Sequence, residues 1–293
     1  MKNFQILLII SLAVFSVNPV IKIKAQDNNT EVSLKKVWES PDILTTSESV
    51  CYDAGRHVMY VSCINGNPVE KDKNGFIAML SESGEIITLK WVDGLNAPKG
   101  MAIQGRKLYI TDIDRVVAID IENSTISREF PFEGAKFLND ITIDLKGAVY
   151  ISDMATGKIH RINRGFTETW LEDESLINPN GLLYENEKIL IGTKDGIFSV
   201  GVEDKKTVHL VKDTGGIDGL KADGKGNYII SDWKGKIQLV NPKSAPVVLL
   251  NTTDSDINAA DFEFIPKLNL LVVPTFSDNR IMAYELINKK EKE

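Results

Sequence analysis

Histidine and cysteine are both scarce in this chain, with three and two copies among 293 residues. The histidines stand in a predicted turn (His57), near a predicted third strand of a repeat (His160) and in a predicted fourth strand (His209), and no HxH or HExxH spacing occurs. A histidine-based zinc motif and a histidine-based catalytic dyad are therefore excluded. A GxSxG sequence, the commonest serine-esterase signature, is also absent.

Two cysteines are too few to scaffold a chain of this length with disulfides. Cys51 and Cys63 flank a predicted hairpin turn at residues 54–57. A hairpin centred there places Cys51 opposite Tyr60 and leaves Cys63 two or three residues out of register, which would strain a disulfide. Two buried free thiols are the favoured interpretation, and one disulfide is the alternative that an exported protein would allow.

Dense basic clusters and long hydrophobic runs are almost absent as well. Acidic residues outnumber basic ones by 41 to 34, which excludes nucleic acid as an expected partner. The one long apolar run, residues 4–17, follows Lys2 and is shorter than the roughly 20 residues of a membrane-spanning helix. It predicts a signal peptide over residues 1–25, cleaved after Ala25. The mature chain, 26–293, is then periplasmic or secreted, with no membrane span and a net charge of −10.

What the chain has instead is one pattern repeated six times. Each copy has an apolar strand, a turn rich in Gly, Asp, Asn or Lys, and a second strand that ends in a small or polar pair. The second strands end at Cys63, Asp112, Asp153, Thr193, Asp232 and Thr275. These ends are 49, 41, 40, 39 and 43 residues apart, and third and fourth strands follow, as in GKIHRIN and TETWLE. One four-stranded antiparallel sheet per repeat predicts an all-β fold, a six-bladed β-propeller.

The ends of the chain supply the strand that the last repeat lacks. That repeat stops after NRIMAYEL, before a fourth strand, while residues 35–39 (KKVWE) form a strand with no repeat of its own. We therefore expect the N-terminal strand to complete the last blade, because pairing the two ends removes exposed sheet edges. Residues 26–293 then form a single domain, with the charged tail 288–293 frayed.

A polar pair stands 13 to 15 residues before the end of each second strand. The pairs are Glu48-Ser49, Lys99-Gly100, Asn139-Asp140, Asn180-Gly181, Asp218-Gly219 and Ala260-Asp261. The innermost strands of a propeller line its channel, so equivalent positions should converge on the axis. Several of these dipeptides are also common in turns, and a series of ordinary turns is the alternative interpretation.

Taken together, the pairs supply two carboxylates and two amides, from Glu48, Asp218, Asn139 and Asn180. Such oxygens are the ligands that hard cations prefer. The pattern predicts one divalent metal at the channel mouth, calcium first, with manganese, magnesium or zinc as alternatives.

Two repeats depart from this set. Lys99 brings a cation, either in a salt bridge to a neighbouring acid or as a substrate-binding and oxyanion-stabilising group. Asp261 follows Ala260, and we expect it to be a solvated acid at a strand end rather than an acceptor that supports a metal ligand.

The chain resembles the regucalcin (senescence marker protein) and gluconolactonase family over residues 35–287. The motifs that carry the resemblance are SESVCYD, LNDITIDLKGAVYISD, NPNGLLY and DGLKADGKGNYIISDWKGKIQLVN. It implies a six-bladed propeller with lactone or phosphotriester hydrolysis as activity, and a metal held by Glu48, Asn180 and Asp218. Asn139 would be a fourth ligand or a substrate contact. Lys99 matches no fixed ligand of the family, which leaves the substrate open.

The function expected from the ring and the resemblance is a metal-dependent lactonase acting on sugar-derived lactones. Asp218 would activate water or act as nucleophile, and Lys99 would help to stabilise the oxyanion. A non-catalytic, metal-containing propeller that binds a sugar, peptide or protein is the first alternative. The sequence feature that supports this alternative is the polar insertion 65–74. It either covers the channel mouth and contacts a partner or is a plain solvated loop. Cleavage of a phosphotriester or formation of carbon bonds is the second, and an aromatic pocket would favour it.

Overall fold

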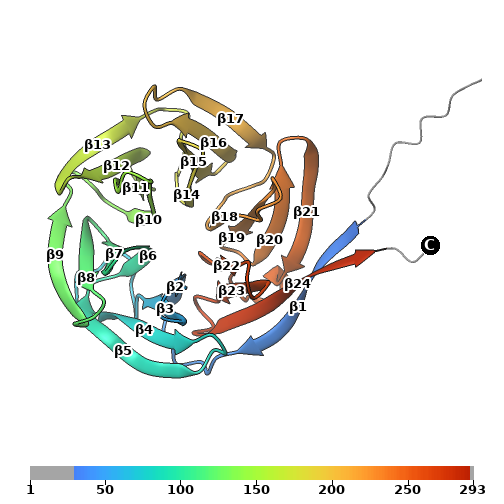
Figure 1. The fold of residues 1–293 in the computed structure, drawn as a ribbon, viewed down its shortest axis with the longest axis horizontal. Coiled ribbons are helices and arrows are strands. Elements are labelled where there is room, and N and C mark those ends of the chain that lie inside the picture. The colour runs from blue at the N-terminus through green and yellow to red at the C-terminus, as the bar shows by residue number, and fades with distance from the viewer. Residues whose placement is uncertain (1–29, 291–293) are drawn as a thin grey trace, which may run out of the picture.

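The computed structural model describes residues 30–290, and the predicted signal peptide with its cleavage site lies outside the described residues. Twenty-four strands form six four-stranded antiparallel sheets arranged as blades around a central channel (Figure 1). The six-bladed β-propeller is thus confirmed. Within the described part of the chain, the one helical element is the short 3-10 turn Thr253–Ser255, and no helix there is long and apolar enough to cross a membrane.

In each of the first five blades the strands follow chain order from the channel to the outer edge. The first three blades are β2 (Ser47–Asp53), β3 (Val58–Cys63), β4 (Gly75–Ser81) and β5 (Ile86–Leu95); β6 (Pro98–Gln104), β7 (Lys107–Asp112), β8 (Arg115–Asp120) and β9 (Thr125–Pro131); and β10 (Leu138–Ile143), β11 (Val149–Asp153), β12 (Lys158–Asn163) and β13 (Phe166–Glu172). The next two are β14 (Leu182–Glu185), β15 (Lys188–Thr193), β16 (Gly196–Gly201) and β17 (Thr207–Lys212); and β18 (Leu220–Ala222), β19 (Tyr228–Asp232), β20 (Lys236–Asn241) and β21 (Ser244–Asn251).

The sixth blade joins the two ends of the described chain. It consists of β22 (Glu263–Ile265), β23 (Leu270–Pro274), β24 (Ile281–Lys290) and, outermost, β1 (Thr30–Glu39). The N-terminal strand therefore completes the last blade, as predicted, and it is longer than the predicted 35–39. Residues 288–290, expected to be frayed, instead continue β24 and pair with residues 30–32. For these three residues the expectation was wrong because β1 begins earlier than its apolar residues suggested, and the rest of the predicted tail, 291–293, lies outside the described residues.

The hydrophobic core lies in layers between neighbouring blades. Tyr150 and Trp170 of the third blade, for example, pack with Ile191 and Phe198 of the fourth. The outermost strands are largely exposed, as in β9, and the second strands are buried nearly throughout, as in β11. The innermost strands are buried less completely, as in β14 and β18. This arrangement leaves the channel-facing ends of the inner strands free to carry polar side chains.

The predicted first hairpin and its cysteines are also as expected. Residues 54–57 form the turn, Cys51 pairs with Tyr60, and Cys63 pairs with Ser47. Both thiols are free and buried. Burial raises the pKa of the Cys63 thiol above its ordinary value. The side chain therefore packs in the hydrophobic core as a neutral thiol and does not act as a nucleophile.

Small polar residues at the ends of the second strands tie each blade to its inner strand. The hydroxyls of Ser62, Ser152 and Ser231 accept the N–H groups of Ser49, Asp140 and Gly219 at 3.0, 3.0 and 2.8 Å. Ser231 also donates to the carbonyl of Ala260 in the next blade, at 2.8 Å. The recurring small or polar pair therefore fixes the segments that carry the channel residues.

Asp153 fixes such a segment with its carboxylate, which accepts the N–H groups of Lys136 and Phe137 at 3.0 and 3.1 Å. Burial would raise the pKa of Asp153, but the His160 ring, the Thr156 hydroxyl and these two N–H groups together lower it to about 2. Because this pKa lies below the unfolded value, the group stabilises the fold above pH ~4, and that stability is lost as the pH falls towards 2.

We expect Asp153→Asn to lower the free energy of unfolding at pH 7 by about 2 kcal/mol, because the carboxylate of Asp153 is fully buried. The difference between the two proteins should shrink between pH ~4 and 2, since acid removes the same charge from the parent. Urea unfolding across this range measures it. A difference that stays constant down to pH 2 would mean that the charge of Asp153 contributes nothing.

Candidate functional site

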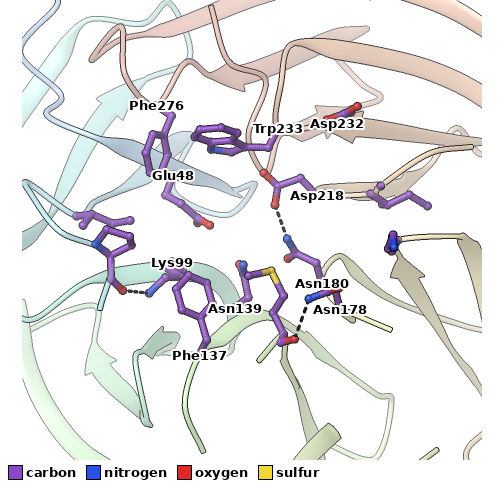
Figure 2. A pocket seen from close by; sticks show the side chains of 16 residues that line it. Glu48, Lys99, Phe137, Asn139, Asn178, Asn180, Asp218, Asp232, Trp233 and Phe276 are labelled. Atoms are coloured by element: carbon purple, nitrogen blue, oxygen red, sulfur yellow. Dashed lines mark hydrogen bonds between the residues drawn. The ribbon is translucent and has the colours of Figure 1, made fainter. Parts of the chain in front are cut away.

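The polar pairs predicted from the repeats lie together at one end of the channel. Glu48 is in β2 and Asn139 in β10, whereas Asn180 and Asp218 stand two residues before β14 and β18. Their side chains point into one space from four different blades (Figure 2). All four are buried and line a cavity of about 450 Å³.

The alternative interpretation of these pairs as ordinary turns is wrong. None of the six pairs lies in a hydrogen-bonded turn, and Gly100, Gly181 and Gly219 do not have a positive φ. These glycines are needed because the next blade approaches closely. A Cβ on Gly181 would meet the carbonyl oxygen of Asp218 at 2.4 Å, and one on Gly100 would meet that of Asn139 at 2.6 Å. Glycine therefore lets the inner strands converge.

Three oxygens in this space are buried and accept no hydrogen bond: Glu48 Oε2, Asn139 Oδ1 and Asn180 Oδ1. Leaving a buried acceptor unpaired costs about 1–3 kcal/mol each, and more for a charged one. Asp218 Oδ1 accepts the amide of Asn180 at 2.7 Å, and no donor among the described residues reaches its Oδ2. Four side chains thus turn oxygens with no hydrogen-bond donor towards the same cavity, which is what a cation site requires.

The charges around the site favour a cation as well. Four carboxylates, of Glu48, Asp140, Asp218 and Asp261, are buried in the channel together with one ammonium group, that of Lys99. A fifth carboxylate, of Glu263, and the ammonium group of Lys221 are half-buried beside them. Burial, then repulsion from Asp261, raises the pKa of Asp218 to about 8, and burial with the same neighbour raises that of Asp140 to about 7. Burial and the Asp218 charge raise the pKa of Glu48 well above its ordinary value.

Within the described residues, no three His, Cys, Asp or Glu side chains gather as a metal-ligand set. The candidate set holds only two carboxylates, and its other two members are amides. This composition fits a cation that accepts neutral oxygen ligands, such as calcium, better than one that needs imidazole or thiolate.

Lys99 lines the same cavity but is engaged elsewhere. Its Nζ is almost fully buried and donates to the carbonyls of Pro68 and Ala97, at 3.0 and 2.9 Å, and lies 4.5 Å from the centre of the Phe137 ring. Burial lowers the pKa of Lys99 to about 8, against the pull of Glu48. Within the described residues, no carboxylate lies within ion-pair distance of Nζ, so the salt bridge, one of the two alternatives for Lys99, is not formed. The insertion 65–74 reaches the cavity through Pro68, whose carbonyl accepts a hydrogen bond from Lys99.

Asp261 is not the solvated strand-end acid that we expected. It is 2% exposed, accepts the Ser49 hydroxyl at 2.6 Å and pairs with Lys221 Nζ at 3.4 Å. The expectation failed because Lys221 lies three residues beyond Asp218 on a neighbouring inner strand, and nothing in the repeat marks it as a channel residue. The alternative, an acceptor that supports a metal ligand, is not what the structure has either, because the partners of Asp261 are Ser49 and Lys221 rather than a proposed ligand.

The apolar walls of the cavity were also missed. They come mainly from the residue that directly follows each second-strand end. Five of these six residues line the cavity, namely Ile64, Met154, Lys194, Trp233 and Phe276. Their constant position in the repeat could have identified them as cavity-lining residues. Their side chains, however, are apolar or long and form no recognisable catalytic or metal-binding motif. None of the three histidines lines the cavity.

No protein-family model matches the chain, and no curated protein matches it in sequence. Among solved structures, a gluconolactonase from Xanthomonas campestris matches with a TM-score of 0.66 at 14% identity, over 84% of this chain and 88% of that one. A virginiamycin B lyase from Staphylococcus aureus, in a catalytically inactive histidine-to-alanine variant with quinupristin, gives 0.63 at 14% identity, over 88% and 100%. A protein provisionally assigned as a gluconolactonase gives 0.62 at 15%, over 90% and 95%.

At these identities the likeness establishes a shared fold. The resemblance to gluconolactonase-like propellers that the four sequence motifs predicted therefore extends to the three-dimensional structure.

Proposed function

We propose that the channel mouth is the active site of a cation-dependent lactonase. The observation that carries this proposal is the set of three unpaired buried oxygens, of Glu48, Asn139 and Asn180, beside the Asp218 carboxylate. The fold that the chain shares with a gluconolactonase supports the reaction class. Sugar-derived lactones are the substrates expected from the sequence resemblance.

The reaction adds one water to a cyclic ester. The water oxygen bonds to the carbonyl carbon, the ring C–O bond breaks, and the resulting hydroxy acid releases one proton at neutral pH. A divalent cation held by Glu48, Asn139, Asn180 and Asp218 would polarise the carbonyl oxygen and favour attack on its carbon.

The chain's own residues would hold the ester and move the proton. Asp218 Oδ2, which has no donor among the described residues, takes the proton from the attacking water or attacks the carbon itself. Asn180 fixes the orientation of Asp218 through its amide. Two of the three Nζ hydrogens of Lys99 are used by Pro68 and Ala97, which leaves one to stabilise the oxyanion.

Hydrolysis of a phosphotriester is the second candidate, and the aromatic walls of the cavity favour it. Phe137, Trp233 and Phe276 would contact the organic groups of such an ester. The same cation and the same Asp218 would serve both reactions, so only the preferred substrate separates them.

The test is proton release by the mature protein, stripped with a chelator and then supplied with calcium, manganese, magnesium or zinc. The panel contains glucono-δ-lactone, γ-lactones with and without alkyl groups, and a dialkyl aryl phosphate. We expect lactone hydrolysis to fall at least about 100-fold on stripping and to return with one of the cations.

Other outcomes decide between the alternatives. Faster hydrolysis of the phosphate ester than of any lactone would favour the second candidate. A cation that raises the melting temperature without turnover of any ester would indicate a binding propeller. Turnover that is unaffected by thorough stripping would contradict the cation site.

A further inference from the structure

The walls of the cavity come from one position of the repeat. The residues that directly follow the six second-strand ends, which we name the rim ring, are Ile64, Ile113, Met154, Lys194, Trp233 and Phe276. Each blade contributes its residue at the same position of the repeat, and five of the six line the cavity. Five of the six are apolar. Ile113, which does not line the cavity, packs with Ile64 and Phe276 beneath the wall.

One side of the rim ring is aromatic and remains open to solvent. The Trp233 and Phe276 rings meet edge to face, with 5.3 Å between centroids, and Trp233 is 44% exposed. Figure 2 shows this pair beside Glu48 and Asp218. An exposed tryptophan next to a polar floor is a ready surface for the apolar part of a ligand.

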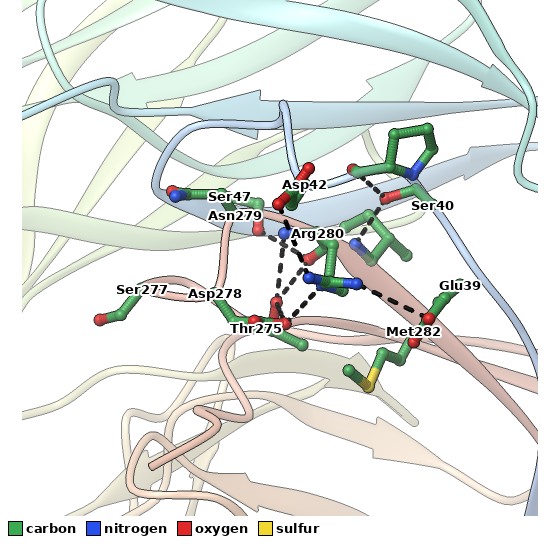
Figure 3. Close-up of polar contacts among 12 residues, drawn as sticks. Glu39, Ser40, Asp42, Ser47, Thr275, Ser277, Asp278, Asn279, Arg280 and Met282 are labelled. Carbon is green, nitrogen blue, oxygen red and sulfur yellow. Dashed lines mark hydrogen bonds and ion pairs between the residues drawn. The ribbon is translucent and has the colours of Figure 1, made fainter. Parts of the chain in front are cut away.

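One member of the aromatic wall, Phe276, is held in place by contacts within the turn between β23 and β24 and by one contact to β1. Phe276 has a φ of 46°, a left-handed conformation that is uncommon for an aromatic residue. The turn that carries it is fixed by Thr275, whose hydroxyl donates to the Arg280 carbonyl at 2.9 Å, and by the ion pair of Arg280 with Asp278 at 2.7 Å (Figure 3). Arg280 also reaches Glu39, at 3.6 Å. The ring is therefore presented in a fixed position.

Polar partners for a polyhydroxylated substrate are few around this wall. Among residues 30–290, apart from the proposed cation ligands and Lys99, only Asn178, Lys194 and Asp232 bring polar side chains to the cavity. Asp232 accepts the N–H of Lys234 at 3.0 Å through Oδ1, so its orientation is fixed and its remaining acceptor sites serve few hydroxyls. Each sugar hydroxyl that is buried without a partner would cost binding energy, whereas an alkyl or aryl group would gain it from Trp233 and Phe276.

We infer that the substrate is a lactone that carries an alkyl or aryl substituent, with its ester on the polar floor and its substituent against Trp233 and Phe276. This inference rests on the proposed function and departs from the sugar-derived lactones expected from the sequence. The bond that breaks is the same ring C–O bond, and water is the only co-reactant. Trp233 is thus a specificity-determining residue rather than a catalytic one.

The test is kcat/KM for γ-lactones with hydrogen, butyl, hexyl or octyl on the γ-carbon, and for glucono-δ-lactone, with the cation-loaded mature protein. We expect kcat/KM to rise about threefold per added methylene until the cavity is filled, and glucono-δ-lactone to be the poorest substrate. Trp233→Ala should reduce the ratio of octyl to unsubstituted lactone at least about tenfold, whereas Trp233→Phe should keep most of it.

Phe166→Ala is the matched control, because Phe166 is 79% exposed on the outer strand β13 and lies away from the cavity. It should leave the ratio unchanged. Hydrolysis of lactones with no dependence on chain length, or a preference for glucono-δ-lactone, would overturn the inference and leave the proposed function intact. Failure to hydrolyse any lactone would overturn both. A ratio that Trp233→Ala does not change would exclude this wall as the substituent's contact.

Discussion

Replacing Asp218 by asparagine should reduce lactone hydrolysis by roughly 10³-fold or more, because it removes the base or nucleophile and one charged cation ligand together. The shape of the side chain is kept, and the amide of Asn180 can still donate to its Oδ1. Proton release and calcium titration by calorimetry measure the two losses separately. A variant that binds calcium weakly but turns over normally at saturating calcium would show that Asp218 is only a ligand.

The same variant should be more stable than the parent when no cation is present. The pKa of Asp218 is raised to about 8 by burial and by the nearby Asp261, so in the parent the folded state favours the protonated form. The cation-free parent should lose stability as the pH rises from about 4 through about 8, and the variant should lose less. Asp213→Asn is the control, because Asp213 is exposed, five residues earlier in the chain. It should change neither turnover nor this pH dependence.

A chain that begins at Ser40 should fail to form a stable propeller. It lacks β1, which pairs with β24 through nine residue pairs, from Thr30 with Lys290 to Glu39 with Met282. Trp38 also packs against the hydrophobic layer between the first and last blades, and a Cβ on Gly84 of the first blade would meet its ring at 2.4 Å. Losing this strand removes three half-buried apolar side chains, of Val32, Leu34 and Trp38, and uncovers the buried strand β24. Full burial of one such side chain contributes about 1.5–3 kcal/mol, so even partial losses are large against a total of about 5–15 kcal/mol.

The matched control is a chain that begins at Thr30 and so keeps β1. It should unfold cooperatively at the same temperature as residues 26–293, measured by circular dichroism. We expect the shorter chain to aggregate or to melt at least about 15 °C lower. If it melted within about 5 °C of the control, closure through β1 would not be what holds the ring together.

The sequence was sufficient to predict the fold because the propeller consists of the same four-stranded antiparallel sheet repeated six times. A single strand pattern is ambiguous, but six copies with nearly equal spacing leave few architectures. The same repetition predicts that Glu48, Asn139, Asn180 and Asp218 lie close together, since each stands at the equivalent position of its repeat. The closing strand followed from the missing fourth strand of the last repeat.

The parts that could not be predicted depend on where side chains point within the repeat. Asp261 was misjudged because its partner Lys221 comes from another blade, and contacts across blades leave no local pattern. The use of Lys99 to hold Pro68 depends on the path of the insertion 65–74, which no periodicity constrains. The aromatic wall was missed because Trp233 and Phe276 resemble ordinary strand-end residues until the ring is closed.

The joined sixth blade also has a consequence for the order of folding during synthesis. β1 is the first described strand to be made, yet its partner β24 begins only at Ile281. At typical rates of synthesis the wait between them is on the order of 10–50 s. Throughout that interval the chain can form blades one after another but has no partner for its earliest strand. Until β24 has been made, the blades form an open arc, and the channel mouth becomes a complete binding site only when β24 pairs with β1.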